Sequence, residues 1–347
     1  MCSDTTATAA DDHGGPDAQG IPLHDFSTNS NACGPCPTAL VAVQGADATR
    51  YPAPAYCALR RRLAGFHGVD ARRIVVAASA SEFIFRITAA VAHEGARTVR
   101  LPSHGYGDYA KAAQAWGRQM LRGDAAAGDA QLVWCCDPSS PLGQAQAGLG
   151  ECVDALEAGA TGVLDLAYEP LRLQGQLALN DVQRDRVWQL WTPNKALGLT
   201  GIRGAYAIAP AGPSGAALQD RIEGLAPSWP LGEHGAALLD VWTTDEVRRW
   251  LVQSRETLRL WKTAQQALLR DAMGWTCLPG DANFFCARPA LPPGMTLMQV
   301  LAGLRAHGIK LRDCASFGLP GHVRVSVQPP AAQDALHNAW QEFIKAS

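Results

Sequence analysis

The sequence has few lysines, no excess of charge of either sign and no long apolar run. Five of its 347 residues are lysine and 25 are arginine, so chemistry that needs a primary amine has five candidates. Acidic residues number 32 and basic residues 30, which gives no electrostatic reason to expect nucleic acid or an anionic membrane as a partner. No apolar run approaches about 18 residues, and positions 1–20 are small, polar and acidic, so neither a membrane span nor a signal peptide is predicted.

Cysteine is more abundant, with ten residues, but its spacing does not indicate a metal site. Cys33 and Cys36 have the separation of a redox or zinc half-site, yet no second pair of Cys or His follows at similar spacing. Cys135 and Cys136 lie in an apolar stretch, where cysteine behaves as a small hydrophobic residue. We therefore predict no metal, and free thiols in a protein of the reducing cytoplasm.

Length and composition indicate a globular protein of roughly two domains. Hydrophobic residues make up 47% and charged residues 18% of the chain. We expect a disordered leader at 1–20 and an N-terminal arm at 21–48 that joins the small domain. A large domain should span 49–235, and a long helix with a small C-terminal domain should span 236–347.

Strand and helix patterns alternate through the expected large domain. Short apolar runs predict buried strands at 74–77, 98–101, 132–136, 162–166, 188–191 and 205–209. Helical patterns lie before and between them, at 57–66, 82–92 and 109–116. This alternation predicts an α/β fold, with a mostly parallel sheet covered by helices on both faces. Ligands in such a fold bind beyond the carboxyl ends of the strands.

The C-terminal third has a different, α+β pattern. A long helix is predicted around 247–268, and Thr243 and Glu246 form a candidate capping box before it. After it come predicted elements at 283–287 (strand), 296–307 (helix), 309–312 (strand) and 323–327 (strand). We therefore expect a second, smaller domain.

Lys195 is the lysine best placed for chemistry. It follows a predicted strand in the turn-rich run Thr192-Pro-Asn-Lys195, whereas the other four lysines fall on helices, at the tail or in the small domain. A primary amine on such a loop can form a Schiff base. Thr192 and the downstream Arg203 can hold an anion such as a phosphate.

The segment 192–206 resembles the lysine motif of fold-type I pyridoxal-phosphate enzymes of the aminotransferase class I/II family, Ser/Thr-x-Ser-Lys followed by Gly-x-Arg. Further family motifs occur in the right order. The resemblance implies an aspartate aminotransferase-like fold, with a large cofactor-binding domain and a smaller α+β domain. It also implies the cofactor pyridoxal 5'-phosphate and these cofactor-binding residues: Ser79, Ala80, Ser81, Tyr106, Ser140, Asp165, Tyr168, Thr192, Asn194 and Arg203.

The resemblance gives several of these residues a role. Asp165 would pair with the protonated pyridine nitrogen, and Tyr168 would bond the ring oxygen. Tyr106 would stack on the ring, and the turn at 79–81 would bind the phosphate at a helix N-terminus.

Two positions depart from the family pattern. Ser140 stands where the family has the Asn that bonds the ring oxygen, and Asn194 stands where it has Ser. The ring-oxygen contact should therefore depend more heavily on Tyr168.

The chain ends resemble the branch that contains histidinol-phosphate aminotransferases and threonine-phosphate decarboxylases. The opening Asp-Phe-Ser-x-Asn-x-Asn arm supplies Asn31 as a candidate substrate-binding residue. In that branch the tyrosine matching Tyr51 reaches the phosphate in the neighbouring subunit, which implies a homodimer with shared sites. Arg324 matches the carboxylate-binding arginine, and Arg312 either binds a substrate phosphate or caps its strand.

The resemblance, together with the two departures from it, leaves three functional hypotheses. The Arg312-Asp-Cys run is most like the decarboxylase branch, which implies a lyase that forms an external aldimine with L-threonine O-3-phosphate and releases CO2 in cobalamin biosynthesis. The first alternative is an aminotransferase of the histidinol-phosphate type, in which Lys195 moves the Cα proton. The second alternative is a non-catalytic homologue that binds the cofactor, because Ser140 and Asn194 depart from the family pattern.

Overall fold

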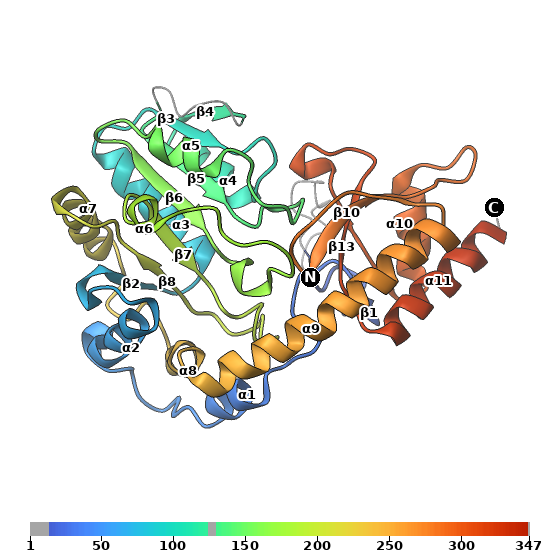
Figure 1. The fold of residues 1–347 in the computed structure, drawn as a ribbon, viewed down its shortest axis with the longest axis horizontal. Helices are drawn as coiled ribbons and strands as arrows, with labels where there is room; N and C mark the ends of the chain where they lie inside the picture. The colour runs from blue at the N-terminus through green and yellow to red at the C-terminus, as the bar shows by residue number, and fades with distance from the viewer. Residues whose placement is uncertain (1–13, 124–129, 346–347) are drawn as a thin grey trace, which may run out of the picture.

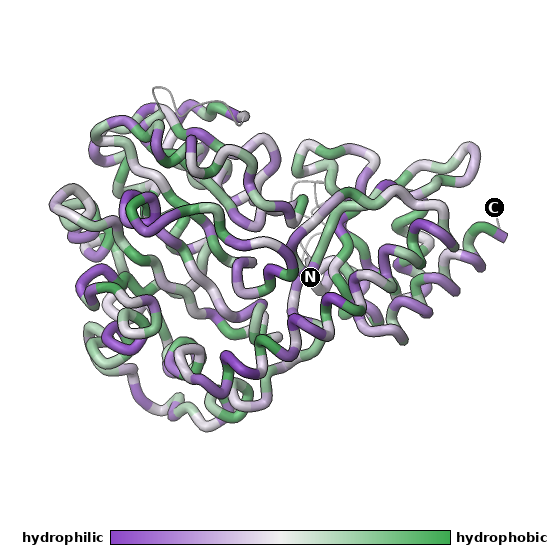
Figure 2. The backbone as a smooth tube through the Cα atoms, in the orientation of Figure 1, coloured by the Kyte–Doolittle hydropathy of each residue, from purple (hydrophilic) through white to green (hydrophobic). Residues whose placement is uncertain are grey.

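The computed structural model describes residues 14–123 and 130–345, which form a large and a small lobe connected by one long helix (Figure 1). This helix, α9 (Asp245–Ala267), runs along one side of both lobes and ends in a π-helical turn, Leu268–Ala272. Its buried face includes Val247, Leu251 and Leu258, and hydrophilic and hydrophobic segments alternate along its length (Figure 2). No helix within the described residues is long and apolar enough to cross a membrane.

The large lobe is built on a seven-stranded sheet in the order β2-β8-β7-β6-β5-β3-β4. The strands are β2 (Ile74–Ala77), β3 (Thr98–Leu101), β4 (Gln119–Arg122), β5 (Leu132–Cys136), β6 (Thr161–Asp165), β7 (Trp188–Trp191) and β8 (Ala205–Ile208). All neighbours are parallel except β8, which is antiparallel to β2 and β7. The predicted α/β fold with a mostly parallel sheet is confirmed; the edge strand β4 was not predicted.

Helices cover both faces of this sheet. On one face lie α3 (Ala80–His93), α4 (Gly107–Ala115) and α7 (Pro213–Gly224); on the other lie α2 (Cys57–His67), α5 (Leu149–Asp154), α6 (Asp181–Arg184) and α8 (Glu233–Trp242). In β2, Val75 packs into the first layer and Ile74 and Val76 into the second. A strand that is buried on both faces has an almost continuous apolar sequence. This is why six of the seven strands could be predicted from the sequence. The expected domain boundary at 235/236 falls inside α8.

The small lobe contains an antiparallel sheet in the order β12-β13-β10-β9. Its elements are β9 (Thr276–Cys277), β10 (Phe284–Arg288), α10 (Leu297–Ala306), β12 (Arg312–Asp313), β13 (Val323–Ser326) and α11 (Pro330–Lys345). Phe285 and Val325 pack with α10 and α11 in the core. Because side chains alternate along a strand, Arg324 of β13 lies on the opposite face of this sheet.

Two local predictions in this region are wrong. The strand predicted at 309–312 is split: β11 (Ile309–Lys310) pairs in parallel with β1 (His24–Asp25), whereas β12 pairs with β13. The capping box of Thr243 with Glu246 is also wrong. Thr244 caps α9, because its hydroxyl accepts a hydrogen bond from the Val247 N–H at 3.5 Å.

The N-terminal residues have defined contacts with both lobes. Asp17 accepts two 2.9 Å hydrogen bonds from Arg305 and lies 3.3 Å from Lys310 Nζ, so the prediction of a disordered leader is wrong for residues 14–20. Positions 1–13 lie outside the described residues. Further along the arm, α1 (Pro37–Gln44) packs against α8 and α9.

Candidate active site

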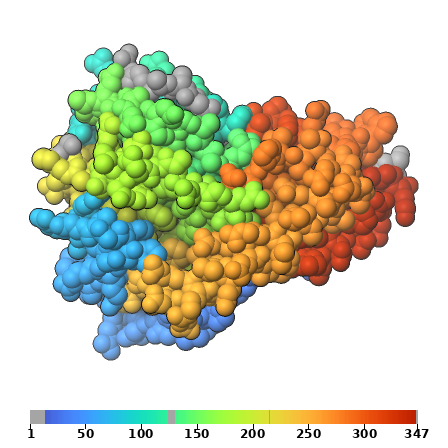
Figure 3. All heavy atoms as spheres, viewed as in Figure 1, coloured from blue at the N-terminus to red at the C-terminus, as the bar shows by residue number. Residues whose placement is uncertain are grey.

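A cavity of about 900 Å³ lies at the carboxyl ends of β2, β5, β6 and β7, and residues of the small lobe form part of its wall. Figure 3 shows the two lobes in contact along α9. Thirteen of the residues predicted from the sequence line this cavity: Ser79, Ala80, Ser81, Tyr106, Ser140, Asp165, Tyr168, Thr192, Asn194, Lys195, Arg203, Arg312 and Arg324. The topology thus brings together side chains that are up to 245 positions apart in sequence, from Ser79 to Arg324.

Lys195 is held on a short, braced loop after β7. Asn194 Oδ1 accepts hydrogen bonds from the Lys195 N–H (2.9 Å) and from Thr192 Oγ1 (3.0 Å). Lys195 Nζ lies 5.2 Å from the centre of the Tyr168 ring. The Asn that replaces the family's Ser at 194 therefore stabilises the backbone that carries the amine.

Asp165, at the end of β6, is a buried carboxylate with defined partners. Oδ2 accepts a hydrogen bond from Tyr109 Oη at 2.6 Å, and Oδ1 accepts one from the Ala167 N–H at 2.9 Å. Burial raises the pKa of Asp165, while the Tyr109 bond, the Ala167 N–H and the charge of Lys195 oppose that rise. A buried carboxylate held in this way is suited to a cationic partner.

The start of α3 and two side chains near it form a set of donors suited to a phosphate. Ser79 caps α3, and its Oγ accepts a hydrogen bond from the Glu82 N–H at 3.0 Å. Ser81 Oγ lies 3.2 Å from Tyr106 Oη, and Arg203 lines the same cavity. Backbone N–H groups at a helix N-terminus, hydroxyls and a guanidinium are the groups that bind phosphate in proteins.

Two tyrosines complete the large-lobe side of the cavity. Burial raises the pKa of Tyr106 to about 12, so its hydroxyl stays protonated. Tyr168 Oη accepts a hydrogen bond from Asn29 Nδ2 at 3.2 Å, and its ring packs edge-on against Phe284, 4.6 Å between centres.

The small lobe contributes two buried arginines that are direct neighbours across β12 and β13. The Arg312 and Arg324 guanidiniums lie 5.0 Å and 5.6 Å from the centre of the Phe317 ring. Arg324 donates to Ser27 O (2.9 Å) and Ser140 Oγ (3.4 Å), and its Nε has no hydrogen-bond partner among the described residues. Both guanidiniums line the cavity, and their planar sets of N–H donors suit a carboxylate or a phosphate.

The structure does not bring Asn31 to the cavity. Its Nδ2 donates 3.0 Å hydrogen bonds to Ala196 O and Ser254 Oγ, and its N–H donates to Lys195 O at 2.9 Å. Asn31 therefore fixes the Lys195 loop against α9, and Asn29, two residues earlier, lines the cavity instead.

Tyr51 also lies outside this subunit's cavity. Three-quarters of its surface is exposed, and its ring stacks on Trp229 at 4.3 Å between centres. The Trp229 indole donates to Pro52 O at 3.2 Å, which holds the pair in place.

Sequence reasoning missed Asn29, Cys136 and Tyr109, all of which line the cavity. Tyr109 gave a usable signal, because it lies three residues after Tyr106 at the start of a helix that follows a strand. Cys33 and Cys36 are free thiols, and no group of three metal-ligating side chains occurs within the described part of the chain.

The family model of the class I and II aminotransferases matches residues 22–341. The chain belongs to this family. Among curated proteins, it is 28% identical to the histidinol-phosphate aminotransferase of Symbiobacterium thermophilum over 342 residues, which cover 89% of this chain and 88% of that protein. It is 27% identical to the histidinol-phosphate aminotransferase of Ruegeria pomeroyi over 343 residues, covering 92% and 91%.

Solved structures named as an aminotransferase and as a decarboxylase have the same fold. One is the histidinol-phosphate aminotransferase of Sinorhizobium meliloti in complex with pyridoxal-5'-phosphate, with a TM-score of 0.77, 22% identity, and coverage of 92% of this chain and 90% of that one. Another is the L-threonine-O-3-phosphate decarboxylase of Porphyromonas gingivalis, with a TM-score of 0.70, 20% identity, and coverage of 88% and 92%. The predicted fold type I architecture and family membership are confirmed.

Pyridoxal 5'-phosphate is the cofactor of this class I and II aminotransferase family, and the residues present fit it. The cavity offers a primary amine, a buried carboxylate and a set of phosphate donors within one space. The chain is therefore a pyridoxal-phosphate-dependent enzyme, of a class to which both decarboxylases and aminotransferases belong.

Proposed function

We propose that this enzyme decarboxylates a phosphorylated amino acid of the L-threonine O-3-phosphate type. The supporting observation is the pair of buried arginines, Arg312 and Arg324, at neighbouring register positions on one wall of the cavity. Two buried cations on adjacent strands repel each other, and bound anions offset that repulsion. A substrate with both a carboxylate and a phosphate supplies one anion for each guanidinium.

Each arginine suits a different group of that substrate. Arg324 has a buried Nε without a partner among the described residues, so it can add a planar, bidentate contact to a carboxylate. Arg312 donates to Ser316 Oγ at 2.9 Å, which adds a hydroxyl beside it for phosphate binding. Held at both ends in this way, the substrate would present its amine toward Lys195.

The large-lobe residues would hold the cofactor and manage the proton. Pyridoxal phosphate supplies an electron sink next to the substrate amine. Ser79, Ser81, Thr192 and Arg203 would bind its phosphate, and Asp165 would pair with its protonated ring nitrogen. Lys195 would then deliver the proton that replaces CO2 at Cα.

The test is a product assay on the purified, cofactor-loaded protein. With O-phospho-L-threonine and no keto acid, we expect release of CO2 and formation of the corresponding amino alcohol phosphate in equal amounts. Dependence of turnover on an added keto acid, with no CO2 released, would contradict decarboxylation.

An aminotransferase of the histidinol-phosphate type is the second candidate. It is favoured by the similarity to the two curated relatives above, which are named histidinol-phosphate aminotransferases and which this chain matches along most of their length. In this reaction Lys195 would move a proton from the substrate Cα, and Arg324 would bind the carboxylate of the amino-group partner. The same assay with histidinol phosphate and a keto acid separates the two candidates.

We also propose that the enzyme works as a homodimer in which Tyr51 completes the site of the partner subunit. The support is that Tyr51 is exposed, is held in place by Trp229 and does not line its own cavity. A mixture of Lys195→Ala and Tyr51→Ala chains, each poorly active alone, should regain about a quarter of wild-type activity, because half the dimers are hybrids with one intact site. If the mixture is no more active than its components, the sites are not shared.

A further inference from the structure

The described residues that line the cavity carry a strong excess of positive charge. Six of them are cationic: Lys111, Arg122, Lys195, Arg203, Arg312 and Arg324. Only one, Asp165, is acidic. Four of the six cations have a role in the cofactor and substrate sites described above, and Lys111 and Arg122 have none.

Lys111 and Arg122 come from the outer part of the large lobe. Besides Tyr109, the residues of α4 that line the cavity are Gly107, Ala110, Lys111 and Gln114, at the spacing of one helix face. Tyr109 lies inward on the same helix, where it bonds Asp165. Along α4 the cavity-lining residues therefore change from small ones at the N-terminal end to the long polar Lys111 and Gln114. Arg122, the last residue of β4, also lines the cavity.

Exposure distinguishes these two cations from the anion-binding arginines of the small lobe. Lys111 and Arg122 are exposed, whereas Arg312 and Arg324 are buried. Exposed cations at the edge of a concave, low-dielectric site attract an approaching anion before any direct contact forms. This long-range attraction raises the rate of association more than it raises the affinity.

We propose that Lys111 and Arg122 form an outer anion subsite that captures phosphate monoesters on their way into the cavity. The cofactor is such an ester, with a charge of about −1.5 to −2 near pH 7. The substrate under the proposed function is another, so the same subsite would receive both. Capture of the cofactor requires only that the chain belongs to its family, whereas capture of the substrate also rests on the proposed function.

The test measures how fast pyridoxal 5'-phosphate associates with the full-length apoprotein, by stopped-flow absorbance at low and high salt. The double variant K111A/R122A should associate about tenfold more slowly than wild type at 0.01 M salt. This difference should shrink to less than about twofold at 1 M salt, where the Debye length falls from about 30 Å to about 3 Å.

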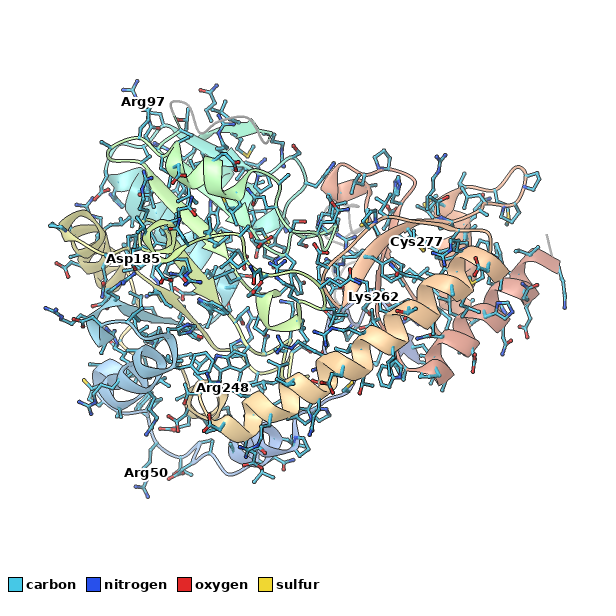
Figure 4. All side chains as sticks on the ribbon, viewed as in Figure 1. Arg50, Arg97, Asp185, Arg248, Lys262 and Cys277 are labelled. Atoms are coloured by element: carbon cyan, nitrogen blue, oxygen red, sulfur yellow. The ribbon has the colours of Figure 1, made fainter. Side chains whose placement is uncertain are left out.

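Two control variants distinguish the loss of these two charges from a change in structure and from the loss of a charge elsewhere on the surface. K111R/R122K keeps both charges and should associate at the wild-type rate. Arg97→Ala removes one exposed charge from the outer end of the large lobe, away from the small lobe (Figure 4), and should also leave the rate unchanged. Equal rates for wild type and K111A/R122A at low salt, or a slowing that persists at 1 M salt, would overturn the proposal.

The substrate arm uses kcat/KM for O-phospho-L-threonine at the same two salt concentrations. We expect K111A/R122A to lower kcat/KM at low salt while kcat changes less than about twofold, because the subsite acts before the chemical step. If wild type does not turn over this substrate, the proposed function fails, and the cofactor association rates still decide whether the subsite exists.

Discussion

Replacing Lys195 with alanine is expected to lower kcat by about 10⁴-fold or more, because one amine supplies both the covalent link to the cofactor and the proton transfer at Cα. The variant should still bind the cofactor, since Asp165 and the donors around Ser79 remain. The measurement is turnover of the substrate identified by the product assay, together with borohydride reduction of the loaded wild-type protein and mass spectrometry of its peptides. The reduced cofactor should be found on Lys195.

Lys262 is the lysine against which the assignment of Lys195 has to be tested. It is buried on α9, and burial lowers the pKa of its amine to about 8, which on electrostatic grounds alone would favour it as a nucleophile (Figure 4). Its Nζ, however, donates to Gly280 O and to Ala282 O, the latter at 2.8 Å, and it does not line the cavity. Recovery of the reduced cofactor on Lys262, or full biological activity of Lys195→Ala, would contradict our assignment; the second result would favour a non-catalytic protein.

Asp165→Asn should have the second largest effect, a loss of about 10³-fold in kcat/KM. The substitution keeps the shape of the side chain but removes the buried negative charge that would pair with the cofactor's ring nitrogen. An amide at this position also has to accommodate the Tyr109 hydroxyl at 2.6 Å. Cofactor affinity, measured by absorbance titration of the apoprotein, should fall with turnover.

Tyr109→Phe is the matched control for Asp165, because it removes one hydrogen bond while leaving the ring stacked on Trp134 at 4.5 Å. The Tyr109 bond lowers the pKa of Asp165 against the effect of burial, so the variant carboxyl should have a higher pKa. Since Asp165 has to be ionised, the acid limb of the activity profile should move to higher pH, and kcat/KM should fall only about tenfold. An unchanged limb would mean that Asp165 does not control it.

The residues that sequence reasoning identified best are those at the ends of buried strands. Asp165 lies at the end of one short apolar run and Lys195 follows another, and the architecture of a parallel sheet brings such strand ends to one edge. The motif order then indicated the chemistry. The local apolar pattern is sufficient there because both faces of the strands are buried.

Elsewhere the local pattern was insufficient. β4 is an edge strand whose residues are exposed or half-buried, so it leaves no apolar run. Asn29 and Asn31 have the same residue type two positions apart in an irregular arm, and only the tertiary hydrogen bonds of Asn31 distinguish them. The split between β11 and β12 depends on two different partner strands, which one segment cannot reveal.

The pairing of β1 with β11 sets an order for assembly during synthesis. Residues 24–25 are synthesised before the large sheet, but their partner strand at 309–310 is synthesised after it. The seven strands of the large sheet lie between residues 74 and 208, so that lobe can form while the rest is still being translated. The wall that carries Lys195 and Asp165 would therefore be complete before the wall that carries Arg312 and Arg324.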